Sequence, residues 1–377
     1  MIIGNDFTTL CKKKLRDGIT FNITKLLACK TKLLGFKKYS CKECSHCKTV
    51  AFTCKGRFCS SCGKKQTDNW IAKATNVLPK TRWQHITFTM PDSLWKLFWL
   101  NRDLLNIISS IAAGIIQEIA KKKNAVAGIF TALHTFGRDL KRNVHIHLSV
   151  TCGGLNDKHN WVNLFFPAAP IKKMWRHRVI ELFRNKYDSQ NLFLPKCYRT
   201  KTSFDLWMQK LYETPWYVYL QKPSDDHKRN IEYLGRYIKR PPISEARIDE
   251  YDGEQVTFRF LDHYNGTTEY IKMHVLNFIA RLIRHIPDRN FKMIRYYGFL
   301  SNRTRGKKLP LVYKAIKQVV AKIVKTLTWR MMLFLRFSKD PLTCPNCNIQ
   351  LSLKQVYYGL SPPLLTLHID RMINDSE

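Results

Sequence analysis

Two Cys-x-x-Cys pairs near the N-terminus restrict the local fold more than any other feature of the chain. Cys41 with Cys44 and Cys59 with Cys62 form these pairs, and 14 residues separate one pair from the other. Four thiolates at this spacing can bind one tetrahedral zinc ion, as in ribbon-like structural sites. Such a site leaves no open position for a substrate, so its role would be structural. The pattern predicts a small zinc-binding module that depends on its metal for stability.

The remaining cysteines leave alternatives open. Cys29 and Cys54 lie around the same two pairs and could form a second site or serve as alternative ligands, whereas Cys47 could be a bystander. Cys344 and Cys347 form a further Cys-x-x-Cys knuckle far downstream. That knuckle is only half of a zinc site, so either distant residues complete it or it is a turn without a metal.

The charge of the chain indicates its partner. Among 377 residues there are 64 Lys and Arg against 28 Asp and Glu, a net charge of +36 that recurs along the whole length. A field of this size repels itself without an anion, and phosphate neutralisation with counterion release provides the gain. We expect a nucleic-acid partner, with Lys55 and Arg57 making the cysteine module basic enough to dock on DNA.

No membrane or export address is evident in the sequence. The most apolar stretch, Leu94 to Ala120, contains Lys96, Arg102 and other polar residues, so it is typical of a core-facing helix. The N-terminus lacks a charged start followed by an apolar run. Twelve cysteines in a chain without an export signal indicate metal binding or free thiols. We expect no membrane partner and a cytoplasmic, nucleoid-associated location.

Composition divides the chain into three segments. Residues 1–78 are rich in cysteine, and residues 79–305 contain apolar runs with the periodicity of strands and of helices. Residues 306–377 contain a lysine-rich helix and the second knuckle. In the middle segment Trp83–Met90 alternates strictly and predicts a strand, and Pro91 begins a helix to about Lys122. Strands grouped with helices predict the α+β class with an antiparallel sheet. One hairpin is predicted from Gly128–Phe136 with Val144–Thr151, and a second from Val256–Asp262 with Thr268–His274. A helix is predicted near the C-terminus at Val312–Leu335.

A histidine pair lies on the second strand of the first hairpin. Because side chains alternate along a strand, His145 and His147 project from one face while their apolar neighbours project into the core. Two imidazoles on a rigid strand form a bidentate metal clamp. A hairpin centred near Leu140 would place His134 opposite the pair as a third ligand, and the alternative for His134 is a hydrogen-bonded core residue.

A tyrosine pair follows in the run Asn230–Pro242. The run is compatible with a helix that ends at its two prolines, and Tyr233 and Tyr237, four residues apart, would share one face of it. Arg236, Lys239 and Arg240 surround them with positive charge. On periodicity alone, an amphipathic helix whose tyrosines pack on the sheet is the alternative.

Together these motifs resemble one family, the HUH two-tyrosine transposases of rolling-circle insertion sequences (the IS91 group), from about residue 25 to residue 350. Lys37 stands where that family commonly has a histidine. The motifs that carry the resemblance are Thr53-Cys54-Lys-Gly-Arg57-Phe-Cys59-Ser-Ser-Cys62, Trp83-Gln-His85-Ile-Thr-Phe-Thr-Met-Pro91, Leu133-His-Thr-Phe-Gly137, Asn143-Val-His145-Ile-His147, Tyr233-Leu-Gly-Arg-Tyr237-Ile-Lys-Arg-Pro-Pro242 and Asp340-Pro-Leu-Thr-Cys344-Pro-Asn-Cys347.

The resemblance implies an HUH endonuclease core with an N-terminal zinc-binding domain and a helical C-terminal region. It implies a catalytic Mg²⁺ or Mn²⁺ on the histidines, and cleavage of single-stranded ends of a mobile element through a 5′-phosphotyrosine. Tyr233 and Tyr237 would be the nucleophiles, Arg236 and Lys239 would support the phenolate, and Arg240 would bind DNA. The alternatives are a rolling-circle replication initiator or relaxase, and an inactive zinc-bearing DNA-binding remnant.

Overall fold

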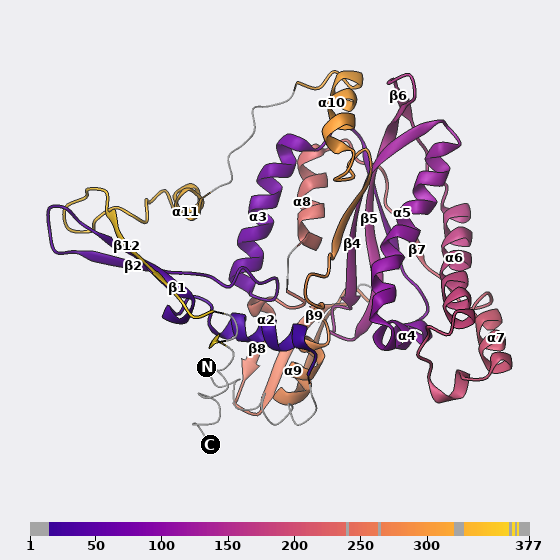
Figure 1. Cartoon of the computed structure of the whole chain (residues 1–377), viewed down its shortest axis with the longest axis horizontal. Coiled ribbons are helices and arrows are strands. Elements are labelled where there is room, and N and C mark those ends of the chain that lie inside the picture. Colours follow the sequence, from indigo (N-terminus) through magenta and orange to yellow (C-terminus); the bar gives the residue numbers. More distant parts are fainter. Residues whose placement is uncertain are drawn as a thin grey trace.

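The chain is organised around one antiparallel sheet (Figure 1). The structure, a computed structural model, describes residues 15–238, 241–262, 265–319, 328–361, 364–365 and 368. Within these residues the central sheet has six strands in the order β11-β4-β5-β3-β7, with β6 paired to β5. Their bounds are β3 (Trp83–Phe88), β4 (Ala125–Phe136), β5 (Arg142–Asn156), β6 (Trp161–Asn163), β7 (Val218–Leu220) and β11 (Ile294–Gly298).

Helices cover both faces of this sheet, because the alternation along its strands sends apolar side chains both ways. On one face Ile86 and Phe88 join the core beneath the helices α5 and α6. On the other face lie α3 and α8, side by side, with α10 near one end (Figure 1). These elements confirm the α+β class, and their bounds are α3 (Ser60–Val77), α5 (Leu105–Lys121), α6 (Ala168–Asp188), α8 (His227–Ile238) and α10 (Arg305–Ala315).

The helix predicted from Pro91 to Lys122 is interrupted at Asn101. Trp95–Leu100 forms α4, and α5 begins only at Leu105. The Asn101 side chain donates to the Leu97 carbonyl and pairs in both directions with the backbone of Phe193, which fixes the chain in a non-helical turn. Among the described residues one helical segment, 102–121, is long and apolar enough to cross a membrane, but half of it is buried in the protein core.

The first hairpin matches its prediction closely and carries the histidines. β4 and β5 pair in a register that sets His134 opposite His145, as a turn near Leu140 requires. Leu140 is buried and adopts a left-handed backbone (φ 62°), which a leucine does at some cost. The His285 ring stabilises this turn, since its Nε2 donates to the Leu140 carbonyl at 3.0 Å.

The second predicted hairpin is also present, in a smaller sheet of order β10-β9-β8. This sheet packs with α9 and the N-terminal helix α2 around its own buried cluster. Residues 263 and 264, between the two predicted strands, lie outside the described residues. The elements are α2 (Asp17–Leu27), β8 (Ile248–Tyr251), β9 (Gln255–Leu261), β10 (Thr268–His274) and α9 (Val275–Ile283).

The two ends of the chain form a third sheet together. β1 (Gly35–Ser40) pairs with β2 (Cys47–Ala51) on one side and with β12 (Ser352–Tyr358) on the other. This sheet extends away from the central one as an arm, with α11 (Trp329–Phe337) beside it (Figure 1). Residues 306–377 are therefore not purely helical, and their last strand belongs to the N-terminal module.

The single helix predicted over Val312–Leu335 is wrong. α10 buries Val312 and Tyr313 against the central sheet and ends at Ala315, where the chain turns through Lys317 in a left-handed conformation. The next helix among the described residues is α11, which begins at Trp329 and contacts the arm. The two helices pack against different partners, α10 against the central sheet and α11 against the arm.

Candidate active site and zinc centres

Three histidines meet on the face of the central sheet that α3 and α8 cover. His134 projects from β4 beside His145 and His147 of β5, and one nitrogen from each ring lies within 4.8 Å of the others. The Nε2 atoms of His145 and His147 are 3.1 Å apart. His145 donates through Nδ1 to the Asn143 carbonyl at 2.9 Å, so its Nε2 lone pair is directed toward its neighbours.

This donor set fits a divalent metal ion. Burial lowers the pKa of all three histidines below the ordinary value, and their mutual repulsion lowers it further for His134 and His147, so the rings are neutral and can act as ligands. Two ligands at right angles and about 2.1 Å from an ion are about 3.0 Å apart, close to the separation of the His145 and His147 nitrogens.

Helix α8 holds both tyrosines over these rings because it approaches α3 closely. A Cβ on Gly235 would lie 2.7 Å from the end of Ile71, so the glycine between the tyrosines allows the two helices to touch. Leu234 is buried in the apolar cluster of this interface, and Tyr237 packs against the same cluster. The four-residue spacing places their ring centroids 5.1 Å apart.

Each tyrosine stacks on a histidine of its own. Tyr237 lies over His147, with ring centroids 3.8 Å apart and planes inclined by 22°. Tyr233 lies over His85 of β3, at 4.1 Å and 30°. The Tyr233 hydroxyl also accepts a hydrogen bond from Gln221 at 2.9 Å. Tyr237 is therefore the tyrosine next to the three-histidine cluster, and Tyr233 is one helical turn away from it.

The electrostatics keep the Tyr237 hydroxyl protonated in the resting protein. Burial, reinforced by the Tyr233 hydroxyl, raises the pKa of Tyr237 far above the ordinary value, and the nearby Arg236 guanidinium opposes this shift. Arg236 is exposed and lies 5.8 Å from the centroid of the Tyr233 ring. Two residues, Arg236 and Lys239, were predicted to support the phenolate, and of these Arg236 is the one that the described structure places at the site.

Arg57 reaches this site from the cysteine module. Its guanidinium donates to the Tyr237 carbonyl at 3.2 Å, so a positive charge lies at the C-terminal end of α8. Burial lowers the pKa of Arg57 to about 10, at which it still carries its charge near neutral pH. Lys55, two residues earlier, is exposed, and Lys239 and Arg240 lie outside the described residues.

The cysteines form two clusters, and the predicted single site of Cys41, Cys44, Cys59 and Cys62 is wrong in its grouping. Each of those two pairs meets two other cysteines instead. The first cluster adds Cys29 and Cys54 to Cys59 and Cys62, and the second adds Cys344 and Cys347 to Cys41 and Cys44.

Both clusters have the dimensions of a tetrahedral thiolate site. Four sulfurs at about 2.3 Å from a zinc ion are about 3.8 Å from one another. In the first cluster the Sγ atom of Cys62 lies 3.7 Å from that of Cys29 and 3.6 Å from that of Cys54. In the second, the Sγ atoms of Cys44 and Cys344 are 3.7 Å apart. Cys47 is exposed and belongs to neither cluster.

Two groups at the site had only weak signals in the sequence. His85 lies on the polar face of its strand, as the alternation predicts, but no spacing rule connects it to Tyr233. Its Nδ1 pairs with Ser149 Oγ at 2.5 Å, and its Nε2 has no hydrogen-bond partner among the described residues. The Cys344 knuckle showed half a zinc site, and only the pairing of β1 with β12 reveals the other half.

Comparisons with known proteins agree with this geometry. A family model for a transposase zinc-binding domain matches residues 3–90, and one described as "Putative transposase" matches residues 128–308. The chain is 37% identical over 360 residues to the transposase for insertion sequence element IS801 of Pseudomonas savastanoi pv. phaseolicola, covering 94% of this chain and 88% of that protein. It is 27% identical over 300 residues to "Putative transposase y4qJ" of Sinorhizobium fredii, covering 76% and 75%. No solved structure matches. The chain belongs to the IS91 family of transposases.

Proposed function

We propose that this transposase cleaves and rejoins single-stranded DNA by tyrosine transesterification, in rolling-circle transposition of an insertion sequence. The observation that carries the proposal is the position of Tyr237, stacked on His147 at 3.8 Å beside a three-histidine cluster. A nucleophile next to a metal site is what phosphodiester transfer requires.

His134, His145 and His147 would hold the divalent ion. An ion bound there would polarise the non-bridging oxygens of the scissile phosphate. Imidazole nitrogens suit transition metals better than they suit Mg²⁺, which prefers oxygen ligands, so within the expected pair Mn²⁺ fits this site better.

The tyrosine supplies the covalent step. The Tyr237 oxygen attacks phosphorus as the bond to the 3′ oxygen breaks, which forms a 5′-phosphotyrosine and releases a 3′-OH. The phenolic proton leaves with the attack, and the 3′ oxygen takes up a proton as it departs. Because the hydroxyl is protonated at rest, Arg236 and the charge at the metal site must lower its pKa when DNA binds. The energy of the phosphodiester stays in the ester, so rejoining needs no ATP.

Tyr233 would hold a second 5′ end. It lies one helical turn from Tyr237 on the same face, with its ring on His85 and its hydroxyl fixed by Gln221. A second acceptor at this distance allows one strand to remain attached while the other is transferred. This is a physical reason for two tyrosines four residues apart.

Zinc would be structural at both cysteine clusters. Each cluster offers four thiolates, which close the coordination sphere and leave no position for a substrate. We assign one ion to Cys29, Cys54, Cys59 and Cys62 and a second ion to Cys41, Cys44, Cys344 and Cys347.

The test is a covalent adduct between protein and single-stranded DNA. Full-length protein is incubated with Mn²⁺ and single strands from the flanking ends of the element, and adducts are separated on a denaturing gel. The proposal predicts a DNA-shifted band that EDTA prevents and that the His147→Ala variant does not form. No adduct from zinc-loaded protein on any end sequence would favour the inactive DNA-binding remnant.

A further inference from the structure

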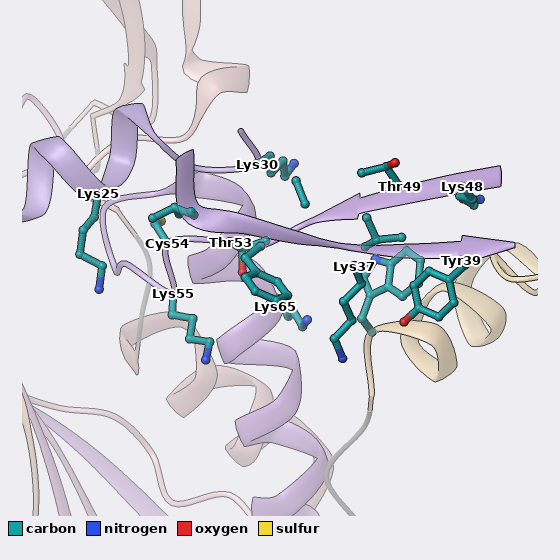
Figure 2. Close-up of a pocket in the computed structure, with 15 residues that line it drawn as sticks. Lys25, Lys30, Lys37, Tyr39, Lys48, Thr49, Thr53, Cys54, Lys55 and Lys65 are labelled. Atoms are coloured by element: carbon teal, nitrogen blue, oxygen red, sulfur yellow. The ribbon is translucent and has the colours of Figure 1, made fainter. Parts of the chain in front are cut away.

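We propose that a basic, aromatic-lined groove between the arm and α3 binds single-stranded DNA and leads it to the nucleophile helix. This inference rests on the proposed function for the identity of the strand, and on its own observations for the site. The groove has a volume of about 880 Å³ and lies beside the first cysteine cluster (Figure 2).

Lysines provide the charge of this groove. Lys25, Lys37, Lys55 and Lys65 come from α2, β1, the cysteine loop and α3, and their side chains extend to the same side of the strands (Figure 2). The groove lining contains no acidic residue, and within the described part of the chain none of these four amines has a salt bridge. Four unneutralised amines along one groove are a site for successive phosphates.

Aromatic rings lie between the amines. Tyr39 of β1 and Trp329 of α11 both line the groove and are half-buried, so part of each ring remains accessible. An unpaired base can stack on such a ring, whereas a paired base in a duplex cannot reach it. The combination of amines and rings therefore favours a single strand over a duplex.

The second cysteine cluster holds one wall of the groove in place. Trp329 lies far from β1 in the sequence, but it packs in the same buried cluster as Tyr39, Cys44 and Cys344. A metal ion that joins Cys41 and Cys44 to the C-terminal knuckle would fix both aromatic walls relative to one another. This provides a function for a C-terminal knuckle that the sequence left unexplained.

One loop connects the groove lining with the active site. Lys55 lines the groove, and Arg57, two residues later, binds the Tyr237 carbonyl. Only Gly56 separates these two residues in the chain. A strand that follows the loop past Lys55 would thus arrive at the end of α8 that carries Tyr237.

The test measures binding of a fluorescent single-stranded oligothymidine of about 20 nucleotides, longer than the roughly 4–16 that a single binding module covers. In the full chain, Lys25, Lys37, Lys55 and Lys65 are changed together to Ala. Each phosphate neutralised on a single strand contributes about −0.7 to the slope of log affinity against log salt, so the four account for about −2.8. The variant should lose most of that slope, and Trp329→Leu should weaken binding about tenfold.

A matched variant controls for net charge. This variant changes four lysines that are exposed and outside the groove to Ala: Lys121, Lys122, Lys123 and Lys158. Its salt slope should differ from that of the wild type by no more than the contribution of one phosphate, about 0.7. Equal slopes for the two quadruple variants would overturn the proposal, as would a duplex that competes as well as the single strand. Adduct formation by the same proteins separates the groove hypothesis from the proposed tyrosine chemistry. If the wild type forms the adduct and the groove variant binds the single strand normally, only the groove hypothesis is refuted. Loss of binding by the groove variant without any wild-type adduct would refute the tyrosine chemistry alone.

Discussion

The second cysteine cluster gives the sharpest test of the molecular architecture. Changing Cys344 and Cys347 together to Ser removes two of its four sulfurs, and two thiolates cannot hold a structural zinc ion at neutral pH. The first cluster lies on other elements and keeps its four sulfurs. We therefore expect the zinc content to fall from two ions per chain to one.

The magnitude follows from the geometry of the site. Binding to a complete four-thiolate site contributes roughly 10–16 kcal/mol, so the change releases the ion completely rather than weakening it. Cys44 and Cys344 are 300 residues apart, and their ion would join the two ends of the chain. Its loss should free β12 from β1, whereas the central sheet keeps its own core.

The assay combines metal analysis with hydrogen exchange. Elemental analysis counts zinc per chain, and exchange should accelerate in residues 352–358 and 35–40 but not in β4 or β5. A Cys47→Ser, Cys197→Ser double variant is the control, because both thiols are exposed and outside the clusters. Two zinc ions retained in the Cys344, Cys347 variant, or one ion in the wild type, would refute the two-cluster assignment.

Three further predictions concern histidines. His147→Ala should abolish the covalent adduct on a denaturing gel, while its affinity for a single strand, measured by fluorescence anisotropy, stays unchanged. His134→Ala should cause a cleavage defect that Mn²⁺ relieves at a lower concentration than Mg²⁺ does. Normal cleavage by His147→Ala would exclude the histidine cluster as the metal site. Burial lowers the pKa of His285 to about 4, so the folded state resists protonation and stability is lost as pH falls from about 6.5 toward 4. Between pH 7 and pH 5 this group should account for about 2 kcal/mol of unfolding free energy. Urea denaturation should show a smaller acid loss in His285→Gln, and an identical pH dependence would contradict the assignment.

Local rules predicted the histidine hairpin correctly. The alternation of β5 fixes the face of His145 and His147, and a short turn then determines which residue of β4 lies opposite them. A turn centred near Leu140 predicted His134 opposite the pair, with a hydrogen-bonded core residue as the alternative, and the register sets His134 opposite His145. The tyrosine spacing was predictable in the same way, since four residues is close to one helical turn.

Long-range pairing was not predictable from local patterns. The second cysteine cluster depends on β12 pairing with β1, about 300 residues away, and no periodicity carries that information. The break at Asn101 likewise depends on a partner, Phe193, that is distant in the chain. The pairing of His85 with Tyr233 requires the close contact of α3 and α8 at Gly235, which sets where α8 lies on the sheet.

The central claim is that Tyr237 is the first nucleophile, and peptide mapping of the DNA adduct tests it most directly. Wild-type protein is trapped with a single-stranded end and Mn²⁺, then digested, and the nucleotide-bearing peptide is sequenced by mass spectrometry. Tyr237→Phe removes only the hydroxyl, so it should keep fold and DNA affinity but lose this adduct, and the Tyr233→Phe, Tyr237→Phe double variant should form none. Label on the Tyr237 peptide would agree with the stacking of that ring on His147. Label on the Tyr233 peptide or on any other residue, or an adduct that persists in the double variant, would contradict the account.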